Sequence, residues 1–192
     1  LNLQSCTVLL LEPNGLGMDV LVQILMGFGV SRFLRASTCA EAQQHARTAT
    51  VDLIICEGGF SQPGPDGYDF VHWLRRSELD PNAFAPVLMA TAHTSLRDVS
   101  RARDCGASFI VAKPLIPTVL IDRILWLARE QRPYVTADSY VGPDRRFKNE
   151  GPPPGMEGRR STDGPLALSA TGGPNLSQDE VDNFMQPRRV RL

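Results

Sequence analysis

Short apolar runs alternate with stretches of helical periodicity over the first two thirds of the chain. Most runs lack polar alternation, which predicts strands buried on both faces, as in a parallel sheet. They occupy residues 7–11, 31–36, 51–56, 86–90 and 109–112. Helical spacing follows each run, over residues 20–28, 38–46, 68–76, 95–105 and 118–130. This alternation predicts an α/β domain with a doubly wound, five-stranded parallel sheet.

The central apolar run, residues 51–56, is followed directly by a carboxylate, Glu57. In an open parallel sheet, ligands and chemistry gather beyond the carboxyl ends of the strands. We therefore expect a functional site around Glu57.

The composition changes after Arg132. Residues 133–192 hold 8 of the 15 prolines and 7 of the 16 glycines, with few aliphatic side chains. Such a segment cannot bury enough apolar surface to offset its ordering entropy. The sequence thus predicts a domain over residues 1–132 and a largely disordered linker, rich in Pro, Gly and Arg, over residues 133–175. A short amphipathic helix with a basic end is expected over residues 176–192.

A capping box predicts this last helix. Ser177 is the candidate N-cap and Glu180 lies three residues later, flanked by apolar residues in the positions of a hydrophobic staple. Pro187 ends the helix. So short a helix is marginal alone and requires a partner surface. The residues expected to bind that surface are Leu176, Ser177, Glu180, Val181, Phe184 and Met185.

Composition and charge indicate an ordinary globular protein. The net charge is −1, no apolar run has the length of a membrane span, and no basic and apolar leader opens the chain, so a cytoplasmic location is expected. Four cysteines without paired spacing predict reduced, buried thiols rather than a metal site. Acidic residues offset the arginine pairs at 145–146, 159–160 and 188–189, so an adaptor whose basic tail contacts nucleic acid is the least favoured alternative.

Residues 6–131 resemble the receiver domain of response regulators, the CheY-like module with a flavodoxin-like fold. The matching motifs are Val8–Glu12, Asp52–Glu57, Asp66-Gly67, Pro86–Ala92, and Gly106-Ala107 followed by Lys113-Pro114. The resemblance implies self-catalysed phosphorylation, in which clustered carboxylates hold Mg²⁺ and an Asp after the third strand accepts the phosphoryl group. It also implies a histidine kinase or a motor component as a possible partner.

By this resemblance, Thr91 and Lys113 are the hydroxyl and the lysine that hold the phosphoryl group. An inherited scaffold without a remaining role is an equally open interpretation of both. The acceptor position holds Glu57, and the acidic pair after the first strand is reduced to Glu12 and Pro13. Only Glu12 and Glu57 then remain as residual metal ligands, whereas Mg²⁺ demands near-ideal octahedral geometry.

In-line attack tolerates little displacement, since a misplacement of about 1 Å can cost on the order of a hundredfold in rate. We therefore predict a phosphorylation-deficient receiver with no catalytic residue and no bound metal or other cofactor, in which Glu57 pairs with Lys113. A permanently active-like state is less favoured, because one carboxylate supplies neither the charge nor the three acceptor oxygens of a phosphate. A working phospho-receiver that uses Mg²⁺ is the alternative.

Residues 176–182 also resemble the N-terminal peptide of the flagellar motor switch protein FliM, which docks on phosphorylated CheY. This resemblance implies that the tail binds a CheY-type receiver domain, either its own or that of another protein. A capped stub without a partner is the alternative. The sequence as a whole predicts a non-catalytic protein that acts through protein–protein interaction in two-component or chemotaxis and flagellar signalling.

Overall fold

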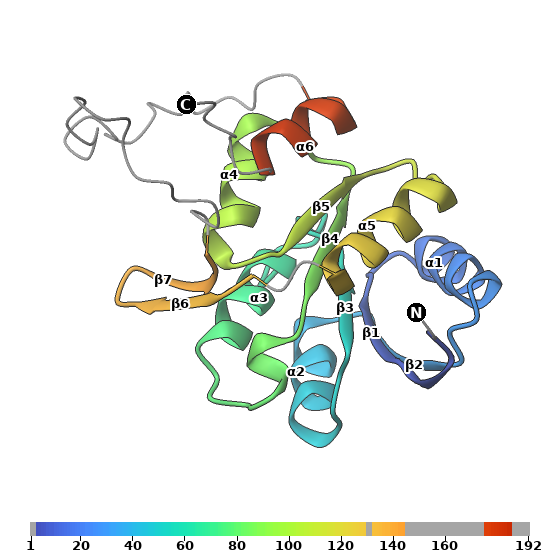
Figure 1. The fold of residues 1–192 in the computed structure, drawn as a ribbon, viewed down its shortest axis with the longest axis horizontal. Coiled ribbons are helices and arrows are strands. Elements are labelled where there is room, and N and C mark those ends of the chain that lie inside the picture. The colour runs from blue at the N-terminus through green and yellow to red at the C-terminus, as the bar shows by residue number, and fades with distance from the viewer. Residues whose placement is uncertain (1–2, 130–131, 145–174, 186–192) are drawn as a thin grey trace.

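The chain forms one five-stranded parallel sheet with the strand order β2-β1-β3-β4-β5. The computed structural model describes residues 3–129, 132–144 and 175–185, with side chains described as far as residue 182 (Figure 1). The sheet consists of β1 (Thr7–Leu11), β2 (Arg32–Ala36), β3 (Leu53–Cys56), β4 (Val87–Thr91) and β5 (Phe109–Ala112). The predicted doubly wound α/β fold is confirmed.

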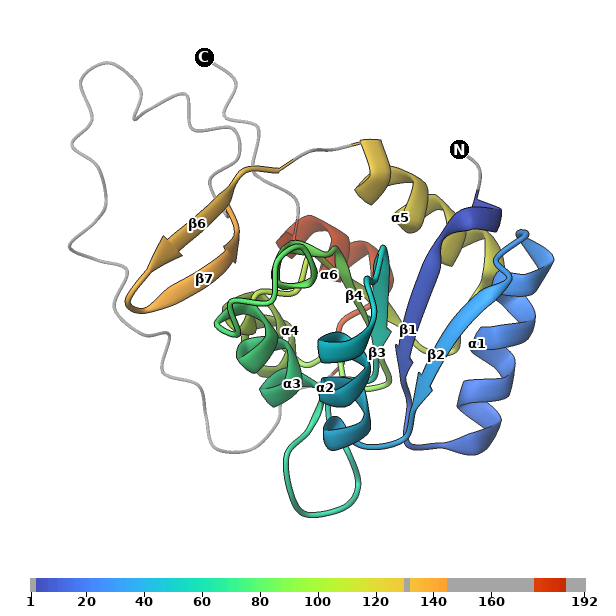
Figure 2. The ribbon, with the colours of Figure 1, turned by 90° about the horizontal axis from the view of Figure 1, so that it is seen from below.

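Five helices cover the two faces of the sheet: α1 (Gly15–Gly27), α2 (Cys39–Thr48), α3 (Gly67–Arg75), α4 (Leu96–Cys105) and α5 (Pro117–Arg129). Two short 3₁₀ helices, η1 (Leu3–Ser5) and η2 (Asn82–Phe84), accompany them. Helices α2, α3 and α4 lie on one face, and α1 and α5 lie on the other (Figure 2). Within the described residues, no helix combines the length and the apolar character that crossing a membrane requires.

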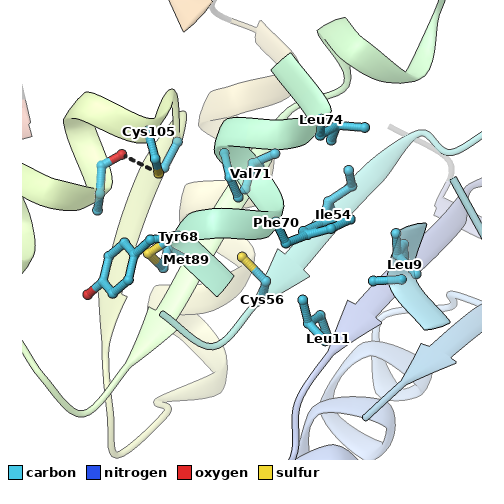
Figure 3. Packing of buried hydrophobic residues seen from close by; sticks show 14 of the residues in the cluster. Leu9, Leu11, Ile54, Cys56, Tyr68, Phe70, Val71, Leu74, Met89 and Cys105 are labelled. Carbon is cyan, nitrogen blue, oxygen red and sulfur yellow. Dashed lines mark hydrogen bonds between the residues drawn. The ribbon is translucent and has the colours of Figure 1, made fainter. Parts of the chain in front are cut away.

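Alternate residues of each central strand enter different core layers, as the geometry of a strand requires. In β3, Ile54 and Cys56 belong to the layer under α2, α3 and α4, whereas Leu53 and Ile55 belong to the layer under α1 and α5. Figure 3 shows the first layer, where side chains of α3 such as Phe70 gather over β1, β3 and β4. This two-sided burial explains why the central runs carry almost no polar residue.

Polar side chains fix where the helices begin. Asn14 accepts a hydrogen bond from the Gly17 amide, so α1 begins at Gly15, earlier than the predicted start at residue 20. Thr38 caps α2 as predicted, and Asp66 and Asp69 form a capping box at α3. At the other end of α4, Gly106 adopts φ +100°, a left-handed conformation that favours glycine.

The four cysteines are free thiols, and three of them, Cys39, Cys56 and Cys105, are buried. Cys6 is only partly buried, so the expectation of buried thiols holds for three of the four. Burial, followed by the charge of Asp66, raises the pKa of Cys39 to about 11. Such thiols stay protonated and unreactive near neutral pH.

The predicted disordered linker over residues 133–175 is wrong at its beginning. Strands β6 (Tyr134–Ala137) and β7 (Tyr140–Pro143) form an antiparallel hairpin that packs beside α3 and α4 (Figure 1). The composition of this segment concealed the hairpin, because its anchors are aromatic rings and glycines rather than aliphatic residues. Residues 145–174 and 186–192, with the three arginine pairs, lie outside the described residues.

A buried arginine holds the hairpin on the domain. Arg75 donates hydrogen bonds to the carbonyls of Gly106, Ala83 and Ala85, and its guanidinium lies over the ring of Tyr134. Gly106 and Gly142 meet there, since a Cβ on Gly142 would stand 2.9 Å from the Gly106 Cα. The hairpin is therefore an integral part of the domain.

The C-terminal helix α6 (Gln178–Met185) lies against β5 and α4 of its own chain (Figure 1). Val181 is fully buried there, in the core layer under α4. The predicted capping box is confirmed, because Glu180 accepts from the backbone amide and hydroxyl of Ser177 and its own amide donates to the Ser177 hydroxyl.

Gly67 is where α3 approaches the end of β3 most closely. A Cβ there would stand 1.8 Å from the Glu57 carbonyl oxygen, a distance that only a backbone shift could relieve. We expect Gly67→Ala to lower the free energy of unfolding by about 3 kcal/mol or more, measured by urea denaturation. In Gly27→Ala the new Cβ meets nothing within 4 Å, so this control should be neutral or more stable by up to about 1 kcal/mol. Equal stability of the two variants would contradict this packing.

Candidate functional site

The candidate site lies at the carboxyl edge of the sheet, where β1 and β3 are neighbours. In doubly wound sheets, this point between strands that continue in opposite directions is where ligands bind. Glu12 follows β1, Glu57 follows β3, Thr91 ends β4 and Lys113 follows β5. The parallel register brings the ends of these strands to one edge.

One ammonium group joins two carboxylates at this edge. The Lys113 Nζ donates to Glu12 Oε2 at 2.5 Å and to Glu57 Oε2 at 2.7 Å. Both acids are buried, with 3% of Glu12 and 9% of Glu57 exposed. The predicted pairing of Glu57 with Lys113 is confirmed, while the contact of Lys113 with Glu12 was not predicted.

The remaining oxygen of each carboxylate accepts a backbone amide. Asn14 N donates to Glu12 Oε1 at 3.0 Å, and Gly58 N donates to Glu57 Oε1 at 2.8 Å. Each of the four carboxylate oxygens thus already accepts a charged or backbone donor. Hydrogen bonds to ionised groups are the stronger ones, so the arrangement fixes both side chains firmly.

The environment keeps Lys113 protonated. Burial by itself would lower the pKa of Lys113, but the hydrogen bonds and negative charges of Glu12 and Glu57 outweigh it and raise that pKa above its ordinary value. Lys113 therefore keeps its positive charge near neutral pH and places it between Glu12 and Glu57.

A magnesium ion, which the resemblance to receivers implies, does not fit these residues. Pro13 has no side-chain oxygen, and both oxygens of Glu12 and of Glu57 are engaged. Within the part of the chain that the structure describes, no three His, Cys, Asp or Glu side chains are grouped so that they could hold a metal ion. The ammonium of Lys113 instead provides the positive charge between the carboxylates.

Thr91 is buried at the end of β4 and faces its own following loop. Its Oγ1 accepts a hydrogen bond from the His93 amide at 3.1 Å, and its carbonyl accepts from the Lys113 amide. The loop after β4 and the end of β5 are therefore tied together through Thr91. No direct hydrogen bond from the Thr91 side chain to the Glu12–Lys113–Glu57 cluster is present among the described contacts.

The tail residues predicted to bind a protein surface are only part of the contact with the domain. Leu176 packs against the core and Val181 is buried in it, whereas Ser177 and Glu180 bond to each other. The side chains of Phe184 and Met185 lie outside the described ones. The prediction missed three polar residues that hold the tail: Asn175, Gln178 and Asp182.

These three residues contact the domain directly, with Asn175 bonded to the loop after β4. Gln178 accepts from the Ala112 amide at 2.6 Å and donates to the Ile110 carbonyl at 3.1 Å. Asp182 forms an ion pair with Arg123 of α5. Residues 178, 181 and 182 share one helical face, so the spacing of the sequence could have indicated them. Their polar side chains, however, give no sign of the groups to which they bond.

Comparisons with known proteins agree with this fold. A family model described as the response regulator receiver domain matches residues 8–125. A search of curated proteins found no match.

Several solved structures are also similar to this chain. A putative response regulator from Chloroflexus aurantiacus is 27% identical with a TM-score of 0.59, over 65% of this chain and 98% of that one. The receiver domain of a signal transduction histidine kinase from Syntrophus aciditrophicus is 26% identical with a TM-score of 0.57, over 70% and 99%. The chemotaxis protein CheY4 of Vibrio cholerae is 25% identical with a TM-score of 0.57, over 63% and 97%.

The residues that the family model matches run from β1 to α5, and in this chain that domain places Glu12, Glu57, Thr91 and Lys113 at a single edge of the sheet. Receiver domains are in general signalling modules rather than enzymes. The chain belongs to the response regulator receiver domain family of two-component signalling.

Proposed function

We propose that this protein is a phosphorylation-deficient receiver that signals through protein–protein contacts in a two-component or chemotaxis pathway. One observation carries the proposal: the Lys113 ammonium lies between the Glu12 and Glu57 carboxylates. The positive charge that a metal ion would bring is supplied by the protein itself, and the carboxylate at the acceptor position is occupied.

Phosphorylation of such a site would require Lys113 to leave at least one carboxylate. Breaking a buried ion pair by withdrawing one partner costs about 3–5 kcal/mol, because the remaining charge stays buried. A Glu at position 57 also places its carboxyl group one methylene further from the backbone than an Asp would. Both features oppose metal binding and in-line attack.

We propose that the tail regulates these protein–protein contacts by docking on the receiver domain of its own chain. Val181 supplies the apolar anchor, the Asp182–Arg123 pair supplies charge, and Gln178 bonds to the edge of β5. Complete burial of a valine side chain contributes about 1.5–3 kcal/mol. This face of β5, α4 and α5 is then unavailable to other proteins until the tail leaves it.

Incubation with acetyl phosphate and Mg²⁺ tests the proposed deficiency. We expect no phosphoryl adduct on the wild-type protein by intact mass spectrometry. The variant with Pro13→Asp and Glu57→Asp restores the missing carboxylate and the shorter acceptor, so it should gain an adduct that chelators prevent. Pro13→Asp with Glu57→Gln is the matched control and should gain none. A stoichiometric adduct on wild-type Glu57 would refute the proposal.

Removal of the lysine tests its role in the cluster. Lys113→Met leaves two buried carboxylates without a cation, so we expect the free energy of unfolding at neutral pH to fall by roughly 3 kcal/mol. Arg97→Met removes an exposed cation of α4 and should change stability by no more than about 0.5 kcal/mol. Urea denaturation measures both. Equal effects would show that the cluster contributes no special stability.

A charge exchange tests the docking of the tail. Asp182→Arg and Arg123→Asp each place like charges together, and ¹⁵N relaxation should then report order parameters below about 0.6 in α6, against about 0.85 for a rigid backbone. The double variant recreates the pair in reverse and should recover much of the order. Docking within one chain also predicts that these values do not depend on protein concentration. Continued order in both single variants would contradict the docking.

A further inference from the structure

The tail bonds to two strand ends at once. Before α6 begins, residues 175 and 176 run beside the loop after β4. Leu176 N donates to the Thr94 carbonyl, and the Thr94 hydroxyl donates to the Leu176 carbonyl at 2.7 Å. Asn175 accepts from the Thr94 amide at 3.2 Å and donates to the Ala92 carbonyl at 3.3 Å. Four hydrogen bonds thus fix the loop that follows Thr91.

The second strand end is that of β5, at the edge of the sheet. An edge strand presents amides and carbonyls without a partner strand. The Gln178 side chain satisfies two of them, the Ala112 amide and the Ile110 carbonyl, by using both ends of one amide group. Ala112 immediately precedes Lys113, so these two hydrogen bonds hold the backbone next to the lysine.

The two fixed segments also bond to each other and to the site. Lys113 N donates to the Thr91 carbonyl at 2.9 Å, and His93 N donates to the Thr91 hydroxyl. The same lysine reaches Glu12 and Glu57 through its ammonium. Hydrogen bonds and the short backbone segments between them therefore connect Asn175, Leu176 and Gln178 with both carboxylates.

A cavity leaves room for this region to rearrange. About 310 Å³ of space lies between the tail and the loop that follows Lys113, lined by Lys113, Pro114, Ile116, Leu176 and Gln178 among others. Ile116 remains 56% exposed at its rim. This space adjoins Lys113 and Pro114, so the loop after β5 has room to move on the side that faces the tail.

We propose that residues 175–178 are a latch that couples the tail to the Glu12–Lys113–Glu57 cluster. With Lys113 between the carboxylates, the ends of β4 and β5 have the spacing that Asn175, Leu176 and Gln178 bind. When Lys113 is withdrawn, Ala112 and the loop after Thr91 shift, the latch loses its hydrogen bonds, and α6 leaves the face of β5 and α4. The inference rests on the proposed function, since it names the regulation of that docked tail.

Coupling of this kind is reciprocal. If withdrawal of Lys113 weakens tail docking by some factor, release of the tail must weaken the lysine cluster by the same factor, and values of about 5–150-fold are typical. The latch thus makes the cluster a sensor of whether the face of β5 is occupied. A structural change at the cluster or at the tail is then transmitted to the other site without a phosphoryl group.

Backbone amides of the full-length protein report on both the latch and the Glu12–Lys113–Glu57 cluster. In the forward direction, hydrogen exchange of the Leu176 and Ala112 amides, which donate to Thr94 and Gln178, measures the latch. We expect Lys113→Met to reduce their protection at least about fivefold. Arg97→Met should leave it unchanged. Glu57→Gln, which retains Lys113 but weakens its pairing, should act in the same direction and serves if Lys113→Met does not fold.

In the reverse direction, the Asn14 and Gly58 amides donate to the two carboxylates, so their chemical shifts report on the cluster. Gln178→Ala and Val181→Asp should move both signals, although neither residue contacts Glu12 or Glu57. Asp179→Ala changes an exposed tail residue and should not move them. Unchanged tail protection in Lys113→Met and Glu57→Gln, or unmoved Asn14 and Gly58 signals in the tail variants, would overturn the latch. Neither result touches the proposed deficiency, which only a wild-type phosphoryl adduct refutes.

Discussion

A single lysine ammonium between two buried carboxylates organises the functional edge of this receiver. Glu12, Glu57 and Lys113 come from the ends of β1, β3 and β5, so their contacts tie three strands of one sheet together. Removing Lys113 would leave two buried carboxylates without a cation, so the arrangement depends on the lysine. The backbone amides of Asn14 and Gly58 donate to the other oxygen of each carboxylate, so every carboxylate oxygen has a hydrogen-bond donor. The cluster thus resembles a site that already contains its cation.

Two segments outside the five-stranded domain, the β6–β7 hairpin and α6, cover part of its surface. Helix α4 lies between two additions to the common receiver fold, with the β6–β7 hairpin on one side and α6 on the other. The hairpin is held by Arg75 and by the close contact of Gly106 with Gly142. The tail is held by Val181, by Asp182 and by the amide of Gln178 at the open edge of β5. An edge strand and a partly apolar face, both liabilities in isolation, are thereby satisfied within one chain.

Much of the fold could be predicted from the sequence, because central strands buried on both faces must be apolar throughout, as residues 53–56 are. The pairing of Glu57 with Lys113 could be predicted because the family resemblance places both residues at the carboxyl ends of strands in one sheet. The contact of Lys113 with Glu12 depends on how far the lysine side chain extends across the carboxyl edge of the sheet. The spacing of residues along the chain does not determine that distance. The hairpin was missed because Pro and Gly indicate disorder by composition, while here Gly142 allows close backbone contact with Gly106. Gln178 and Asp182 were missed because a polar residue gives no sign that it bonds to a strand edge or to a distant arginine.

The most direct test of the central claim is a titration of the Lys113 ammonium itself, observed by ¹⁵N-detected NMR with and without Mg²⁺. We predict that Lys113 titrates above its ordinary pKa of 10.5. We also predict that saturating Mg²⁺ leaves the ammonium signal and the chemical shifts of the Asn14 and Gly58 amides unchanged. A Lys113 pKa at or below the ordinary value, or displacement of the ammonium by Mg²⁺, would contradict the claim that the lysine occupies the place of the cation.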